Sequence, residues 1–217
     1  LLTKLTVKEQ CLYYGTLKGM EKEDILKKMK TLLEKFGVPE YENKKIKELS
    51  KGNQQKIQFI TSIINEPKLL ILDEPFSGLD PFNVELFKNE IVEMSKKGSI
   101  IIFSSHRMEH VELFCKKIVI LLKGKNVLSG NIKDIKKKYR KKNVFVKGNV
   151  TKEELEKIKG VNEIIEHSDE LELKIENEEV APLIFKKIKD KEITKFVLEE
   201  PSLNEIFVAK VGESYEK

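Results

Sequence analysis

Three short, uninterrupted apolar runs constrain the fold of this chain more than any other feature of its sequence. They occupy residues 69–72, residues 100–103 of the segment 99–103, which begins with Ser99, and residues 118–122. Runs of this length are typical of strands that are buried on both faces of a parallel sheet. A helix is predicted between the first two runs, beginning at Asp80-Pro81 and ending at Gly98. Strands that alternate with helices predict an α/β fold with a parallel sheet.

Helices are also predicted before the first run. Two lie within residues 6–36, and a third begins near Ser50, because isoleucines recur at helical spacing from Ile57 to Ile64 before Pro67. The first turn of this third helix reads KGNQQK and contains no acid. Helix N-termini favour negative charge, since their N–H groups and the macrodipole are positive there. One explanation is that an anion from outside the chain neutralises this helix end.

The pattern changes after Gly130. Residues 133–142, KDIKKKYRKK, carry seven basic residues and one acid. We interpret them as a solvated linker helix, with a phosphate or lipid-headgroup contact as the alternative. Residues 143–213 then read as strand, helix, two strands, helix, strand and a final helix, and the first six of these elements have the β-α-β-β-α-β order of a ferredoxin-like module. We find no catalytic constellation in this part.

Composition limits the classes of function. Lys and Arg number 41 against 36 Asp and Glu, and the charges are interspersed, so nothing demands nucleic-acid binding. The only cysteines, Cys11 and Cys115, lack paired metal-ligand spacing, which is typical of a reducing compartment. No apolar run is long enough to cross a membrane, and no secretory signal is visible.

Polar residues follow two of the predicted strands. Asp73 and Glu74 come after the first, and His106 comes after the second, behind Ser104-Ser105. In open α/β sheets, ligands bind at the carboxyl ends of the strands. Carboxylate oxygens suit Mg²⁺, which usually arrives with substrate phosphates, and a second carboxylate can accept a proton from an attacking water. A neutral imidazole at His106 could reach a terminal phosphate or that water.

A competing interpretation uses the same histidine. Residues 106–110, HRMEH, match the H-x-x-E-H pattern of inverted zinc peptidases. That motif needs both histidines on one helical face and a third ligand from elsewhere. His106 ends a predicted strand, and His167 is expected on a strand surface in the second module. A zinc peptidase is therefore the minor alternative.

Four motifs in order carry a family resemblance. LSKGN at 49–53 resembles the LSGGQ signature, LLILDEP at 69–75 a Walker B strand, SGLD at 77–80 a D-loop, and His106 a switch histidine. Together they resemble the nucleotide-binding subunit of an ABC transporter. The charged C-terminal extension is similar to that of ABC-2 exporter ATPases, including sodium-export-like members.

The resemblance implies ATP and Mg²⁺ as cofactors. Asp73 would bind Mg²⁺ through water, Glu74 would polarise the hydrolytic water with His106, and Asp80 would link two sites. The first turn of the signature helix would meet the γ-phosphate of an ATP held by an opposite subunit, through Ser50, Lys51, Gly52 and Asn53. Two positions depart from the family pattern: Lys51 replaces a glycine and Asn53 replaces a glutamine.

The same resemblance implies a setting for the chain. Its partners would be a second nucleotide-binding subunit and a separate transmembrane permease, at the cytoplasmic face of the membrane. None of the eleven glycines begins a G-x-x-x-x-G-K-[ST] phosphate cradle (Walker A). We therefore expect an N-terminally truncated family member that is inactive as an ATPase by itself. A non-catalytic regulatory or assembly subunit is the alternative.

The expected domain organisation follows from these assignments. Residues 1–130 would form a truncated ATPase domain, with a helical subdomain at about 1–66 and the Walker B, D-loop and histidine core at about 67–130. Residues 131–142 would be a basic linker, and residues 143–217 an accessory domain.

Overall fold

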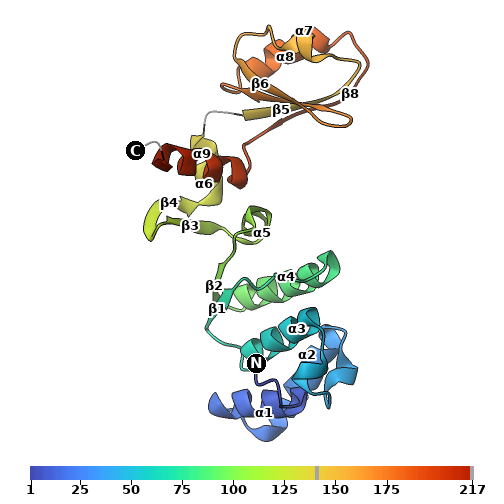
Figure 1. Cartoon of the computed structure of the whole chain (residues 1–217), viewed down its shortest axis with the longest axis vertical. Coiled ribbons are helices and arrows are strands. Elements are labelled where there is room, and N and C mark those ends of the chain that lie inside the picture. The colour runs from blue at the N-terminus through green and yellow to red at the C-terminus, as the bar shows by residue number, and fades with distance from the viewer. Residues whose placement is uncertain (140–141, 216–217) are drawn as a thin grey trace. The chain divides into compact units, whose positions relative to one another are not determined.

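Capping signals in the sequence locate the first helices of the computed structural model, which describes residues 1–139 and 142–215 (Figure 1). Thr6 and Glu9 form a capping box at the start of α1, Val7–Leu17. The second predicted helix is α2, Lys22–Lys35, and two short 3₁₀ turns follow at Pro39–Tyr41 and Ile46–Glu48. The third is α3, Lys51–Ile63, whose N-cap is Ser50. All three predicted helices are confirmed.

A parallel β-α-β unit follows. It consists of β1, Leu69–Asp73, α4, Pro81–Lys96, and β2, Ile100–Ser104. The two strands pair in parallel, with Asp73 opposite Ser104, so their carboxyl ends meet at one edge. This confirms the predicted α/β unit and places the residues that follow each strand side by side.

The prediction that these strands are buried on both faces was wrong. Successive residues of a strand point to opposite faces. One face of β1 and β2 is open, with Leu69 52%, Ile71 70%, Ile100 64% and Ile102 54% exposed. The other face is covered by aromatic side chains, because Phe103 contacts Phe76, which in turn contacts Phe87 of α4. A continuous apolar run therefore does not report burial when only one face has a covering layer.

An aromatic cluster joins the helices of this region. The rings of Phe36, Phe59 and Phe87 lie 4.4–5.7 Å apart between centroids and come from the end of α2, from α3 and from α4. Lys35 reinforces the same junction through ion pairs with Glu90 and Glu93 of α4. Residues 1–106 form one compact unit, and residues 107–217 form a second.

The third predicted strand does not extend the parallel sheet. β3, Lys117–Leu122, pairs antiparallel with β4, Lys125–Asn131. The intervening residues Lys123 and Gly124 both have positive φ, at 49° and 74°. Two such residues form the tight turn that joins antiparallel strands, so this local turn overrides the expected crossover connection.

Two short helices flank this hairpin in the chain. They are α5, Met108–Phe114, and α6, Ile132–Lys138. The helical part of the basic segment is confirmed by α6, whereas Arg140 and Lys141 lie outside the described residues. Lys136 of α6 forms an ion pair with Glu112 of α5, so not all of its lysines are solvated.

The ferredoxin-like module is confirmed. Its elements follow the predicted order, and the strands form one antiparallel sheet in the order β6-β7-β5-β8. The elements are β5 Lys142–Gly148, α7 Lys152–Leu155, β6 Val161–Glu166, β7 Leu171–Ile175, α8 Val180–Ile188 and β8 Ile193–Glu199. Helices α7 and α8 cover one face, and their core includes Val144, Leu155, Leu173 and Ile184.

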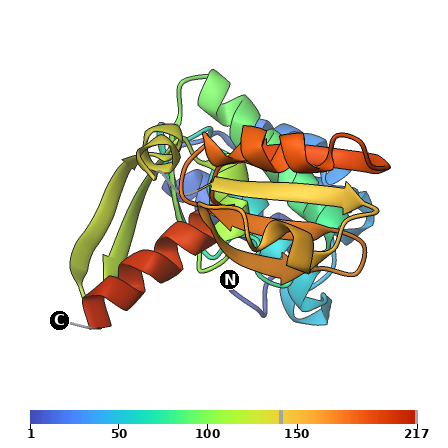
Figure 2. The ribbon, with the colours of Figure 1, turned by 90° about the horizontal axis from the view of Figure 1, so that it is seen from above.

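The final helix, α9, Leu203–Tyr215, returns to the hairpin (Figure 2). Leu203 and Ile206 of α9 pack with isoleucines of β3 and α6, including Ile118 and Ile132. Among the residues that the structure describes, no helix has the length and apolar character needed to cross a bilayer. The expected domain boundaries at 130 and 142 stay a prediction.

Candidate functional site

The candidate site begins where β1 ends. Glu74 has a positive φ of 45°, and its N–H donates to the carbonyl oxygen of Ser104 at 3.2 Å. A non-glycine residue in this region costs about 1–3 kcal/mol unless its surroundings hold it there. The hydrogen bond to the end of β2 supplies such a restraint. The strained residue is one of the two acids that the sequence singled out.

The carboxylate of Glu74 contacts His106 twice. Its Oε1 lies 2.7 Å from the ring Nδ1 and accepts from the backbone N–H of His106 at 2.9 Å. The hydroxyl of Ser105 donates to Oε2 at 3.3 Å. Partial burial alone would raise the pKa of Glu74, but the hydrogen bonds from His106 and Ser105 hold this pKa below its ordinary value. Glu74 is therefore kept ionised beside an exposed imidazole.

Asp73 lies at the same edge. It is exposed and accepts a hydrogen bond from the hydroxyl of Ser104, its partner in the parallel register. Carboxylate and hydroxyl oxygens are the donors that Mg²⁺ prefers, so the chemistry of this edge fits that ion. The described residues contain no cluster of three or more His, Cys, Asp or Glu side chains arranged to hold a metal. An ion here would be held mainly by water and phosphate oxygens, as Mg²⁺ commonly is.

The start of α3 is the second part of the candidate site. Ser50 Oγ accepts from the backbone N–H of Asn53 at 3.3 Å, and the Asn53 amide donates to the Tyr41 hydroxyl at 2.9 Å. Lys51 is exposed, and the first turn contains no acid. A Cβ added to Gly52 would lie 3.4 Å from the carbonyl oxygen of Gly78. The start of α3 therefore lies close to the SGLD segment.

Asp80 ends that segment and caps α4. Its carboxylate accepts from the backbone N–H of Asn83 at 2.9 Å and from the Asn83 side chain. These hydrogen bonds, led by the one from the Asn83 backbone, lower the pKa of Asp80, and the positive charge of Lys56 on α3 contributes. Asp80 thus has a local structural role that the sequence pattern of Asp before Pro already indicates.

The structure brings the predicted residues together in two groups. Glu74 joins His106, and Asp73 lies beside them at the strand ends, whereas Ser50, Gly52 and Asp80 belong to the junction of α3 with the SGLD segment. Within residues 1–139 and 142–215 no hydrogen bond or ion pair joins Ser50 to Glu74. Sequence reasoning missed the donating hydroxyls of Ser104 and Ser105 and the accepting hydroxyl of Tyr41. The register of the two parallel strands would have indicated Ser104 as a partner of Asp73, since Ser104 lies directly opposite Asp73.

The zinc motif does not have its required geometry. α5 begins at Met108, so His110 lies on a helix and His106 lies before it. The two histidines therefore do not share a helical face. His167 lies beyond β6, where its Nε2 is 2.8 Å from Glu172.

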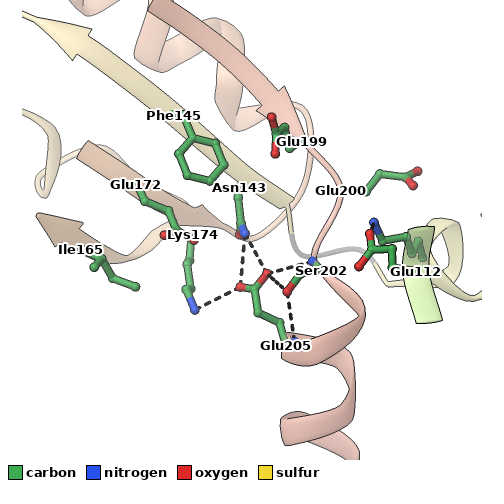
Figure 3. A pocket seen from close by; sticks show the side chains of 11 residues that line it. Glu112, Asn143, Phe145, Ile165, Glu172, Lys174, Glu199, Glu200, Ser202 and Glu205 are labelled. Carbon is green, nitrogen blue, oxygen red and sulfur yellow. Dashed lines mark hydrogen bonds and ion pairs between the residues drawn. The ribbon is translucent and has the colours of Figure 1, made fainter. Parts of the chain in front are cut away.

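A separate cavity of about 380 Å³ lies in the second unit, on the sheet face opposite α8 (Figure 3). Asn143 is 6% exposed and donates to both carboxylate oxygens of Glu205 at 3.0 and 3.2 Å. Lys174 and Ser202 also bind Glu205. Burial alone would raise the pKa of Glu205, but the backbone N–H of Ser202 and these partners lower it. This network fastens α9 to the sheet.

Comparisons with known proteins agree with these motifs. A sequence model of the ABC transporter family matches residues 1–77, and a model described as the C-terminal domain of "ATP-binding protein DrrA1-3-like" matches residues 130–211. The uncharacterized ABC transporter ATP-binding protein BpOF4_11395 of Alkalihalophilus pseudofirmus is 49% identical over 216 residues, which are 99% of this chain and 81% of that protein. The uncharacterized ABC transporter ATP-binding protein YhaQ of Bacillus subtilis is 49% identical over 217 residues, 100% of this chain and 73% of that protein.

A solved structure shows the same likeness. The protein described as "Structure of ATP binding subunit of ABC transporter" is 29% identical, with a TM-score of 0.60, over 64% of this chain and 58% of that one. The fold and the two matching family models identify an ATP-binding subunit of the ABC type. This chain belongs to the family of ABC transporter ATP-binding proteins.

Proposed function

We propose that this chain takes part in ATP hydrolysis that drives export through a separate transmembrane permease. It would act at the cytoplasmic face of the membrane, in a dimer of nucleotide-binding subunits, within a transporter of the ABC-2, sodium-export-like class. The contact between Glu74 and His106 carries this proposal, because it joins an ionised carboxylate to an imidazole at the carboxyl ends of two parallel strands. Ligands of open α/β sheets bind at this edge.

Each residue of this edge has a proposed role. Glu74 accepts a proton from the attacking water, and the hydrogen bonds from His106 and Ser105 keep its carboxylate ionised and oriented. His106 is exposed, so its ring can contact a terminal phosphate oxygen as well. Asp73 would hold Mg²⁺ through its water shell, and the bound ion would neutralise charge on the phosphates.

The start of α3 would bind the terminal phosphate of an ATP that is held by another subunit. Its N–H groups and positive dipole end favour an anion, and no acid of its first turn competes. Ser50, Gly52 and Asn53 would make these contacts, with Lys51 adding positive charge at the rim. Asp80 would link the two ATP sites of the dimer, since the SGLD segment that it ends lies against Gly52.

The phosphate cradle of a complete site is not encoded in these 217 residues. In a dimer with a subunit that has a cradle, one composite site would use the α3 end of this chain. The other would contain Asp73, Glu74 and His106 of this chain without a cradle. For a polypeptide limited to these residues, the second candidate function is a regulatory or assembly subunit without catalysis of its own.

A mixing assay tests the proposal. The partner subunit carries its own signature mutation, so that partner homodimers are silent, and this chain is added as wild type, Ser50→Arg or Glu74→Gln. We expect wild type to restore ATP hydrolysis, Ser50→Arg to abolish it, and Glu74→Gln to retain it. Gln58→Arg, on an exposed position of the same helix, is the matched control and should behave as wild type.

The outcomes separate the alternatives. Equal loss from Ser50→Arg and Glu74→Gln would contradict the composite site. Failure of the wild-type chain to restore hydrolysis, while it still binds the partner, would favour the assembly subunit.

A further inference from the structure

The ferredoxin-like sheet ends in a strand whose outer edge is unpaired in the described part of the chain. The strand order β6-β7-β5-β8 makes β8 an edge strand. An edge strand presents a row of backbone donors and acceptors that can pair with another strand. The side chains of β8 determine which partner fits this edge.

One side of β8 is apolar. Phe196 and Leu198 lie opposite Val146 and Val144 of β5, so they share the face that α8 covers. Leu198 is 42% exposed, and Phe185 of α8, 49% exposed, contacts Phe196 with ring centroids 5.2 Å apart. These three residues form an apolar strip along the edge. Its position beside unpaired backbone is typical of a protein-binding surface.

The other side of β8 is charged. Lys195 and Glu199 lie opposite Lys147 and Asn143 of β5 and therefore face away from α8. Lys195 also forms an ion pair with Glu170 of its own chain at 2.7 Å, and its side chain stays 40% exposed. In a two-fold pairing centred on Val197, Lys195 of each copy lies opposite Glu199 of the other. The same register places Phe196 opposite Leu198 on the apolar side. One register thus matches opposite charges on one face and apolar side chains on the other.

We propose that β8 pairs antiparallel with β8 of a second copy of this chain, which joins two ferredoxin-like sheets into one of eight strands. This interface is separate from the ATP sandwich of the proposed function and does not depend on it. Such two-fold contacts use one surface patch on both copies.

The opposite edge of the sheet lacks this match. The charged residues of β6 are both acids, Glu163 and Glu166, so no two-fold pairing of β6 brings opposite charges together. Acids on an edge strand oppose self-association. The charge pattern therefore favours β8 over β6.

Sedimentation equilibrium of the full chain without nucleotide tests the interface. We expect a concentration-dependent dimer whose dissociation constant rises about tenfold in Lys195→Glu or in Glu199→Lys, since each variant opposes like charges at two pairs. An equimolar mixture of these two variants should dimerise again, because every pair in the heterodimer is then of opposite charge. Recovery on mixing shows that neither variant is misfolded. Ser50→Arg should leave this dimer unchanged.

A crosslink tests the register. Residues directly opposite in an antiparallel pair have Cα atoms about 4.5–5.5 Å apart, within disulfide range. Val197→Cys should therefore crosslink to itself on oxidation, whereas Thr194→Cys, opposite Glu200 of the second copy, and the wild-type chain should not. A monomeric wild type at all concentrations, a dimer indifferent to both charge reversals, or no crosslink through Val197→Cys would overturn the proposal.

Discussion

Replacement of Phe87 by alanine should destabilise the first unit strongly. Phe87 is fully buried on α4, and its ring lies 4.4 Å from that of Phe59 and 5.4 Å from that of Phe36, between centroids. Removing a buried phenylalanine costs about 3–5 kcal/mol through lost burial and the cavity that remains. Each lost ring pair contributes about 0.5–1.5 kcal/mol within such totals. We expect a loss of about 4 kcal/mol in the free energy of unfolding.

Urea denaturation of the full chain, followed by circular dichroism at 222 nm, measures this loss. With a slope of about 2 kcal/mol per molar urea, the midpoint of the first unit should fall by about 2 M. The matched control is Phe82→Ala on the same helix, since Phe82 is 73% exposed. An exposed substitution of this kind usually stays within about 0.5 kcal/mol.

The transition of the second unit should not move, because the ring contacts of Phe87 all lie within residues 1–106. Equal midpoints for Phe87→Ala and Phe82→Ala would refute the argument that this aromatic cluster holds α4 to α2 and α3. A loss from Phe87→Ala below about 1 kcal/mol would do the same.

Three further predictions concern other contacts. Glu205→Ala should lower the free energy of unfolding of the second unit by about 1–3 kcal/mol, because the buried side-chain amide of Asn143 loses its acceptor. Glu176→Ala, at an exposed position, is the control and should change this free energy little. Chemical denaturation of the two variants measures the difference. His106→Ala should raise the pKa of Glu74 towards its ordinary value, as measured by carboxyl NMR titration, and His167→Ala should not. Because the folded pKa of Glu74 is lowered, this contact stabilises the fold above the ordinary carboxyl range and is lost as the pH falls through the lowered pKa. A polypeptide of residues 1–217 alone should hydrolyse ATP negligibly, and steady turnover that disappears in Glu74→Gln would contradict this.

Local signals predicted many of the element boundaries. Thr6 with Glu9, Ser50, and Asp80 before Pro81 each cap a helix through contacts within three residues along the chain. Such contacts depend only on nearby sequence, so they are readable without the fold. The β3–β4 hairpin was not predicted, because the apolar run at residues 118–122 was interpreted as a parallel strand and the turn at Lys123-Gly124 was overlooked.

The candidate site was predictable only in part. The motifs located Asp73, Glu74 and His106 at strand ends, and the parallel arrangement implied that they share an edge. The sequence could not predict that Glu74 adopts a positive φ and accepts hydrogen bonds from both Ser105 and His106. These contacts join residues 31 and 32 positions apart, and they depend on the register of β1 with β2.

The sequence by itself determined the family motifs, the helix caps and the order of elements in residues 1–106 and in the ferredoxin-like module, because these depend on short-range patterns. The tertiary structure decided which strand faces are covered, as Ile71 and Ile102 show, and which distant polar groups meet, as Asn143 and Glu205 do across 62 positions. The reason is physical: burial and pairing depend on the layer that packs against a residue, and a continuous apolar run looks the same whether or not that layer is present.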